Sequence, residues 1–171
     1  STWHEMVSPE GQFAMDEIVV RGNPMRVFRN APPTMRSLWE LTAGYADRDY
    51  LVYEDERLTY AEAAAQVRAL AHLLVDVHGV NRGDRVAIAM RNYSEWVISY
   101  WAIVSIGAAV VGMNAWWTTE EMQYGLSDSR PRVLIADDER LERVMPVLAD
   151  LRADAPMHVI AVRADRALPD D

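Results

Sequence analysis

Four short apolar runs alternate with helical patterns from residue 59 onward, and this alternation limits the possible folds more than any other feature. The runs cover residues 85–90, 108–113, 132–136 and 157–162. They do not alternate between apolar and polar residues, which is typical of strands that are buried on both faces. Strands that alternate with helices through short connections form mainly parallel sheets. The sequence therefore predicts a three-layer α/β fold, with a mainly parallel sheet and helices on both of its faces.

Helix-start and helix-stop signals mark the segments between these strands. Three pairs have the spacing of a capping box, in which a side-chain oxygen and a carboxylate satisfy each other's backbone N–H groups: Thr59 with Glu62, Asn92 with Glu95, and Thr118 with Glu121. Asp137 or Asp138 is expected to cap the helix after the third strand. Gly79 and Gly107 are expected to end two helices, and Gly112 to allow a close backbone approach.

The first 33 residues follow no helical or strand periodicity. Gly11, Gly22, Pro24 and the pair Pro32–Pro33 interrupt this segment. We therefore expect residues 1–33 to form an irregular N-terminal arm, either extended or a meander of short strands. Residues 34–171 are expected to form one partial α/β subdomain, which begins with a helix over about 34–46 and a hairpin over 51–59.

Composition excludes several classes of function. The 26 acidic and 17 basic residues give a net charge of −9, which argues against nucleic-acid binding. There is no cysteine, so a disulfide or a cysteine-based metal site is impossible, and the four histidines are too scattered to indicate a metal. All 17 basic residues are arginines, so no lysine can hold a phosphate or form a Schiff base.

No targeting or membrane segment is indicated. The first residues lack the basic and apolar regions of a secretory signal. The longest mainly apolar run, residues 96–113, falls short of the about 20 apolar residues that span a bilayer. We expect a cytoplasmic protein, and peripheral contact with a membrane stays open.

The glycine-rich turns do not have the order of a phosphate-binding loop. Such a loop follows a strand and opens a helix, so that the helix N-terminus faces the phosphates. The glycines within residues 79–83 and 107–112 follow helical patterns instead. The pair Asp137–Asp138 follows a strand, as in phosphoacceptor signalling domains, but those domains also need a lysine. A helix cap explains the pair better.

Two tryptophans, Trp116 and Trp117, follow Asn114 at the carboxyl end of a predicted strand. Open α/β sheets bind ligands at this edge, which makes the loop a candidate site. Ordinary packing of the tryptophans against the next helix is the alternative, and the simpler one.

Six short motifs occur in order: residues 58–62, 79–88, 92–96, 107–114, 119–129 and 133–137. Over residues 34–151 this ordered series resembles the opening third of the AMP-forming acyl-CoA synthetases, which belong to the adenylate-forming superfamily. The pieces around Asn92–Trp96 and Gly107–Asn114 look most like those of fatty-acid and aryl-acid CoA ligases. The resemblance implies that the parent protein is a carboxylic acid:CoA ligase that uses ATP, Mg and CoA, and fatty acids are the substrate class that it leads us to expect.

The same resemblance implies that much of the ligase lies outside these residues. In the family, the phosphate loop with its lysine, the adenine- and ribose-binding motifs and a small C-terminal domain come later. We therefore expect an incomplete, C-terminally truncated N-terminal subdomain that neither adenylates an acid nor binds ATP appreciably. A non-catalytic interaction or scaffold module with the same fold is the alternative, and homo-oligomerisation stays open.

The resemblance also implies a CoA side of the molecule. In related acetate-type ligases, the loop at the place of Asn114 to Trp117 flanks the pantetheine tunnel, and arginines after the next strand contact the CoA phosphates. Carried over, this assigns Asn114, Trp116, Arg140 and Arg143 to CoA binding. The alternative is that both arginines are solvated helix charges that pair with Glu139 and Glu142. No catalytic and no metal-binding residue is assigned.

Overall fold

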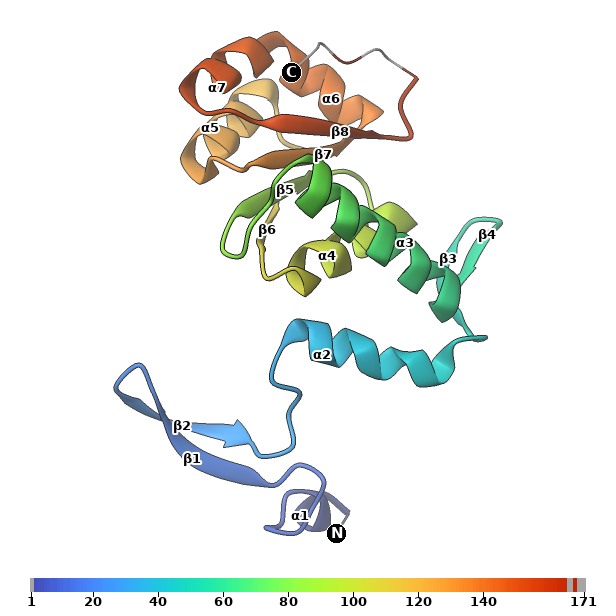
Figure 1. The fold of residues 1–171 in the computed structure, drawn as a ribbon, viewed down its shortest axis with the longest axis vertical. Coiled ribbons are helices and arrows are strands. Elements are labelled where there is room, and N and C mark those ends of the chain that lie inside the picture. Colours follow the sequence, from blue (N-terminus) through green and yellow to red (C-terminus); the bar gives the residue numbers. More distant parts are fainter. Residues whose placement is uncertain (1, 166–167, 169–171) are drawn as a thin grey trace. The chain divides into compact units, whose positions relative to one another are not determined.

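The structure is a computed structural model that describes residues 2–165 and 168 (Figure 1). Its contacts divide the chain into two compact units, Ser1–Leu38 and Trp39–Asp171. The division expected from the sequence lay after residue 33, just before helix α2 (Met35–Glu40). The contact division falls within that helix instead.

The first unit contains more regular structure than an extended arm. A short helix α1 (Thr2–Met6) precedes strands β1 (Met15–Val20) and β2 (Asn23–Phe28), which pair antiparallel. Their two-residue connection places Arg21 at φ 50° and Gly22 at φ 83°, the positive angles that suit a tight hairpin turn. Of the two forms that the sequence left open, the unit therefore has short strands.

The second unit is built on a parallel sheet of four strands. These are β5 (Arg85–Ala89), β6 (Ala109–Gly112), β7 (Val133–Asp137) and β8 (His158–Val162). Their order is β6-β5-β7-β8, and each neighbouring pair is parallel. The predicted sheet is confirmed. The predicted hairpin is also present, as β3 (Asp49–Tyr53) and β4 (Glu56–Thr59).

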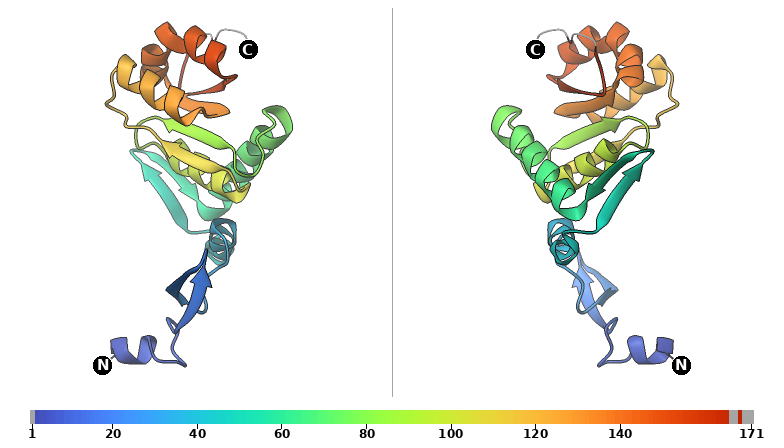
Figure 2. Two further views of the ribbon diagram at one scale, coloured as in Figure 1. Left: turned by 90° about the vertical axis from the view of Figure 1, so that its left-hand side faces the viewer. Right: turned by 90° about the vertical axis from the view of Figure 1, so that its right-hand side faces the viewer.

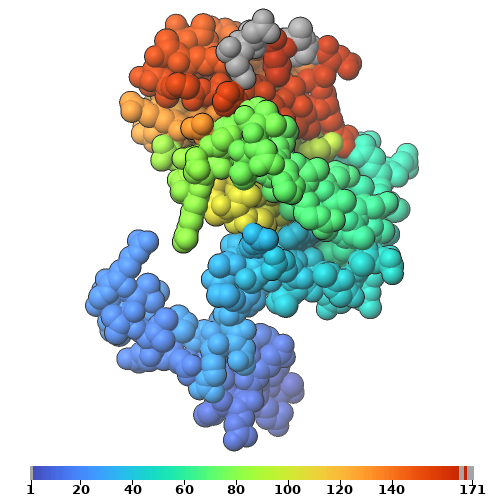
Figure 3. Space-filling model, in the orientation of Figure 1, coloured from blue at the N-terminus to red at the C-terminus, as the bar shows by residue number. Residues whose placement is uncertain are grey.

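Helices cover both faces of this sheet and make three layers (Figures 1 and 2). Helices α3 (Tyr60–His72) and α4 (Ser94–Ser105) pack on one face, and in the space-filling view the green atoms of α3 lie across the middle of this side of the unit, below the orange and red elements (Figure 3). Helices α5 (Thr119–Ser129), α6 (Asp138–Val144) and α7 (Leu148–Asp154) pack on the other. Along β5, Val86 and Ile88 enter the first core and Ala87 and Ala89 the second, which explains the absence of polar residues in the strand.

Three of the predicted helices are not continuous. Residues 41–45 form a 3₁₀-helix η1 (Leu41–Tyr45) after α2, and a π-helical turn η2 (Leu73–Val77) follows α3. The helix expected over 138–151 is divided by a 3₁₀ turn η3 (Met145–Val147) between α6 and α7. Pro146 lies in this last turn, and a proline interrupts a helix because it has no N–H to donate.

Two of the three expected capping boxes are confirmed, at Thr59 and at Thr118. The prediction for Asn92 is wrong. Helix α4 begins later, its N-cap is Tyr93, and no side chain caps it. With the N-cap at Tyr93, Glu95 is the second helical residue and not the third that a capping box needs, and one of its oxygens accepts instead from an arginine that follows β8.

Of the three glycine predictions, two are confirmed and one is wrong. Gly79 and Gly107 adopt φ of 60° and 79°, the left-handed conformation that ends a helix. Gly112 was expected to allow a close approach of the backbone, but an added Cβ there would meet no described atom within 4 Å. That prediction is wrong.

Replacing Ile135 with alanine should destabilise the fold strongly. Ile135 lies on β7 between two paired strands and is 1% exposed. The cavity left behind is expected to lower the free energy of unfolding by about 2–5 kcal/mol. Urea denaturation measures the change, and Val77→Ala at an exposed site provides the control, expected within about 0.5 kcal/mol of the parent chain. Equal effects of the two substitutions would contradict the assigned core.

Candidate functional site

Three loops meet at the carboxyl edge of the sheet, after β5, β6 and β7. The chain leaves β5 toward α4 on one face and leaves β7, its neighbour, toward α6 on the opposite face. Such a reversal is a topological switch point, where open α/β sheets bind their ligands. The carboxyl edge of the sheet is therefore the candidate site.

A buried carboxylate, that of Asp137, ties two of these loops together. Asp137 is 3% exposed and caps α6, as predicted, by accepting from the backbone N–H of Arg140 at 3.0 Å. Its other oxygen accepts from the backbone N–H of Arg91, just after β5, at 2.9 Å. The Arg140 guanidinium lies 3.2 Å from the same carboxylate. The segments that follow β5 and β7 are thus both bound to the carboxylate of Asp137.

Two arginines of α6 hold the third loop. Arg140 is 1% exposed, and it donates from Nε and Nη2 to the backbone carbonyl of Ala115 at 2.8 and 2.6 Å. Arg143 donates to the same carbonyl at 3.1 Å and to that of Trp117 at 2.9 Å. Both arginines also pair with Glu139. Hydrogen bonds from charged donors are the stronger ones, so the loop after β6 is firmly held.

The four residues assigned to the CoA side therefore lie in one region, but in different roles. Asn114 and Trp116 are exposed on the loop, whereas Arg140 is buried beneath it and turned toward its backbone. The alternative that Arg140 is a solvated helix charge is wrong because its side chain is buried. Direct contact of these residues with CoA stays a prediction.

The two tryptophans of this loop also have different environments. Trp116 is 69% exposed, and its backbone N–H is bound by the Asn114 side chain at 2.9 Å. Trp117 packs against α5, so closely that a Cβ added to Gly125 would lie 2.8 Å from its ring. Packing on the next helix therefore describes Trp117, and exposure at the ligand-binding edge describes Trp116.

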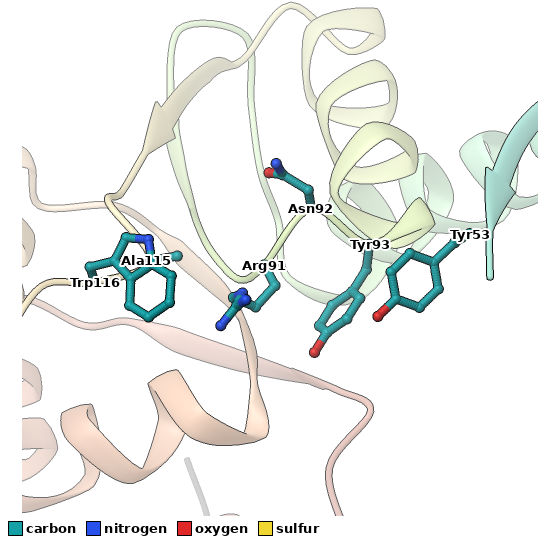
Figure 4. Close-up of a pocket in the computed structure, with 6 residues that line it drawn as sticks. All are labelled: Tyr53, Arg91, Asn92, Tyr93, Ala115 and Trp116. Carbon is teal, nitrogen blue, oxygen red and sulfur yellow. The ribbon is translucent and has the colours of Figure 1, made fainter.

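A cavity of about 470 Å³ opens beside Trp116 at this edge (Figure 4). Its lining comes from the loops after β5 and β6 and from the β3–β4 hairpin: Tyr53, Arg91, Asn92, Tyr93, Ala115 and Trp116. The sequence interpretation singled out Trp116 but missed the residues after β5. The rule that drew attention to Trp116, a position directly after a parallel strand, applies equally to Arg91 and Tyr93.

The side chain of Arg91 lies over an aromatic ring and not against an acid. Its guanidinium carbon lies 4.6 Å from the centre of the Trp116 ring, within the range of a cation–π interaction. Among the residues that the structure describes, no carboxylate pairs with the Arg91 side chain. This exposed cation is therefore available to an anionic ligand.

A further arginine, Arg163, fixes the aromatic wall of the cavity. Its guanidinium lies 5.2 Å from the ring centre of Tyr53 and 4.7 Å from that of Tyr93, whose rings meet edge to face. Hydrogen bonds to Glu56, at 3.0 Å, and to Glu95, at 2.8 Å, raise the pKa of Arg163 above its ordinary value. Burial raises the pKa of the Tyr53 hydroxyl further above neutrality, where a tyrosine is in any case protonated and can donate.

Within residues 2–165 and 168, no three histidine, aspartate or glutamate side chains gather in a way that could hold a metal ion. No helix in the same residues has the length and apolar character needed to cross a membrane.

Comparison with known proteins places this edge in a family context. The model of the family described as AMP-binding enzyme matches residues 38–170. The chain is 36% identical over 104 residues to a medium/long-chain-fatty-acid–CoA/3-oxocholest-4-en-26-oate–CoA ligase of Mycobacterium marinum, which covers 61% of this chain and 19% of that protein. It is 32% identical over 120 residues to a 3-hydroxybenzoate–CoA ligase of an Aromatoleum species, covering 70% and 23%.

A solved structure is similar as well. The crystal structure of an anthranilate CoA ligase in complex with anthranoyl-AMP superposes with a TM-score of 0.70 at 26% identity, covering 75% of this chain and 25% of that one. The chain thus spans only 19% and 23% of the two curated relatives.

Removing the Arg140 guanidinium should cost far more stability than removing that of Arg143. Arg140→Met leaves the Asp137 carboxylate buried without its cation, a loss expected to be about 3–5 kcal/mol. Arg143 is partly exposed, so Arg143→Met should cost less. Urea denaturation compares the two.

A double variant separates lost charge pairing from lost packing. Asn at position 137 can still cap α6, so Asp137→Asn should recover part of the stability lost in Arg140→Met. Equal losses in the two arginine variants, or no recovery in the double variant, would contradict the buried pair.

Proposed function

The chain belongs to the AMP-binding enzyme family, and from this we propose that it forms the N-terminal part of an AMP-forming acid:CoA ligase. In this reaction a carboxylate attacks the α-phosphorus of ATP, which forms an acyl-adenylate and releases pyrophosphate. The thiol of CoA then attacks the acyl carbonyl carbon, and AMP leaves. The observation that carries the proposal is the family match over residues 38–170.

Fatty acids are the proposed substrate class. The support is the 36% identity to a ligase named for medium- and long-chain fatty acids. Aryl acids are the second candidate, because the 3-hydroxybenzoate–CoA ligase matches a larger share of the chain, 70%. The described cavity favours neither class by itself.

The chain's own residues would act on the CoA side of this reaction. Asn114 and Trp116 lie exposed at the carboxyl edge, where they can contact CoA. Arg140 and Arg143 would support CoA binding indirectly, because their guanidinium groups hold the loop by its Ala115 and Trp117 carbonyls. A fixed loop meets its ligand without first being ordered, which improves affinity.

The described residues do not fit the Mg-ATP part of the reaction. A triphosphate needs backbone donors in a glycine loop, a cation such as lysine, and a carboxylate-held Mg ion. The chain has 17 basic residues and all are arginines, and its described acids form no metal-holding cluster. No step through ATP or Mg is therefore derived from these residues.

The proposal is tested on the full-length protein that carries these residues. Fatty acids and aryl acids are supplied separately with Mg-ATP and CoA, and both pyrophosphate release and CoA thioester formation are measured. Fatty acids are expected to give the higher kcat/KM. Pyrophosphate release that no acid stimulates would contradict the ligase and favour a non-catalytic scaffold module.

Residues 1–171 alone should release no pyrophosphate with any acid. The physical reason is the missing triphosphate site, so Mg-ATP should bind this chain no more tightly than AMP does. Calorimetry measures the affinities for Mg-ATP and AMP, and a separate assay measures pyrophosphate release. Micromolar affinity for Mg-ATP, or acid-dependent pyrophosphate release, would contradict the prediction.

A further inference from the structure

We propose that Arg91, held over Trp116, is the anion-binding group of the cavity and takes a phosphate of a nucleotide ligand. The proposal rests on the proposed function, because CoA is the nucleotide that the ligase would bring to this edge. It moves the expected phosphate contact from Arg140 and Arg143 to a residue that the sequence interpretation did not select.

The first argument is the availability of the charge. The guanidinium groups of Arg140, Arg143 and Arg163 each pair with at least one carboxylate. The Arg91 side chain is exposed, and its contact among the described residues is with the Trp116 ring, which cannot neutralise it. A guanidinium presents a fork of N–H donors that matches the geometry of a phosphate.

The second argument is that this charge is already positioned. The backbone N–H of Arg91 is bound by the buried Asp137 carboxylate at 2.9 Å, which fixes the start of the side chain. The Trp116 ring, 4.6 Å from the guanidinium, supports its other end. The loop that carries Trp116 is held in turn by Arg140. Less conformational freedom is therefore lost when an anion binds.

The third argument is the aromatic lining, which suits a flat ring beside the anion. In Figure 4, Arg91 lies between Trp116 and Tyr93, with Tyr53 beyond, while the Asn92 side chain points away from them. Nucleobases stack on such rings, and a volume of about 470 Å³ is that of a small-molecule site. Glu56 and Glu95 are paired with Arg163, so they repel a phosphate less, whereas the charge of Glu54, which also acts on Tyr53, opposes a phosphate at that end of the cavity.

The test is an NMR titration of the 171-residue chain with AMP, CoA, dephospho-CoA, adenosine and inorganic phosphate. AMP and CoA should shift the Trp116 indole and Arg91 Nε–H signals, and adenosine should bind at least tenfold more weakly than AMP. Arg91→Met should weaken AMP and CoA binding tenfold or more, because a charge-assisted hydrogen bond is lost. Arg91→Lys, which keeps the charge without the fork, should fall between.

Arg68→Met is the matched control, since Arg68 is an exposed arginine on α3 and its loss changes net charge equally. It should leave all affinities unchanged. Comparing CoA with dephospho-CoA, which lacks the ribose phosphate, identifies the phosphate that Arg91 binds. If the parent chain binds CoA more tightly than dephospho-CoA and this difference in affinity is lost in Arg91→Met, Arg91 binds the ribose phosphate. An equal loss for both ligands assigns it to the phosphates that they share.

Absence of binding by the parent chain, or equal affinities of Arg91→Met and Arg68→Met, would overturn the proposal. These outcomes are distinct from failure of the ligase assignment. Arg91-dependent nucleotide binding in a full-length protein without acid-dependent pyrophosphate release would remove the ligase but leave the subsite. Ligase activity together with CoA binding that Arg91→Met leaves unchanged would remove the Arg91 subsite but leave the ligase assignment.

Discussion

The buried ion pair between Asp137 and Arg140 is the interaction on which the carboxyl edge of the sheet depends. Both side chains lie almost wholly out of water, at 3% and 1% exposure, where an unpaired charge would be strongly destabilising. Each is compensated by further hydrogen bonds, to the backbone N–H of Arg91 and to the carbonyl of Ala115. One pair therefore joins the loops after β5, β6 and β7, and the contacts of Arg143 with the Ala115 carbonyl and of Arg91 with the Trp116 ring add to it.

The ligand-facing groups follow from this arrangement. Because Arg140 holds the Ala115 carbonyl from beneath, the exposed neighbour Trp116 is kept at the cavity. Because Asp137 holds the backbone of Arg91, the guanidinium reaches the Trp116 ring from the adjacent loop. The arginines thus divide into those that build the site and one that is left to meet a ligand. An arginine after a strand is not by itself a phosphate ligand; its burial decides which role it has.

The sequence predicted the layers and the strands because these depend on local pattern: unbroken apolar runs, capping boxes at Thr59 and Thr118, and left-handed glycines. It failed where distant residues decide. Glu95 has the spacing of a capping residue, but the helix starts one residue later than expected, and one Glu95 oxygen accepts from Arg163, 68 positions away. Arg140 has the spacing of a solvated helix charge, but a loop 25 positions earlier buries it. The edge that holds the candidate site was therefore predictable, whereas the roles of its arginines were not.

A crystal structure of the chain with CoA bound tests this division of roles most directly. The account predicts a CoA phosphate within hydrogen-bonding distance of the Arg91 guanidinium, with Arg140 still donating to the Ala115 carbonyl. A phosphate bound instead by Arg140 or Arg143, with the loop of residues 115–117 released from them, would contradict it.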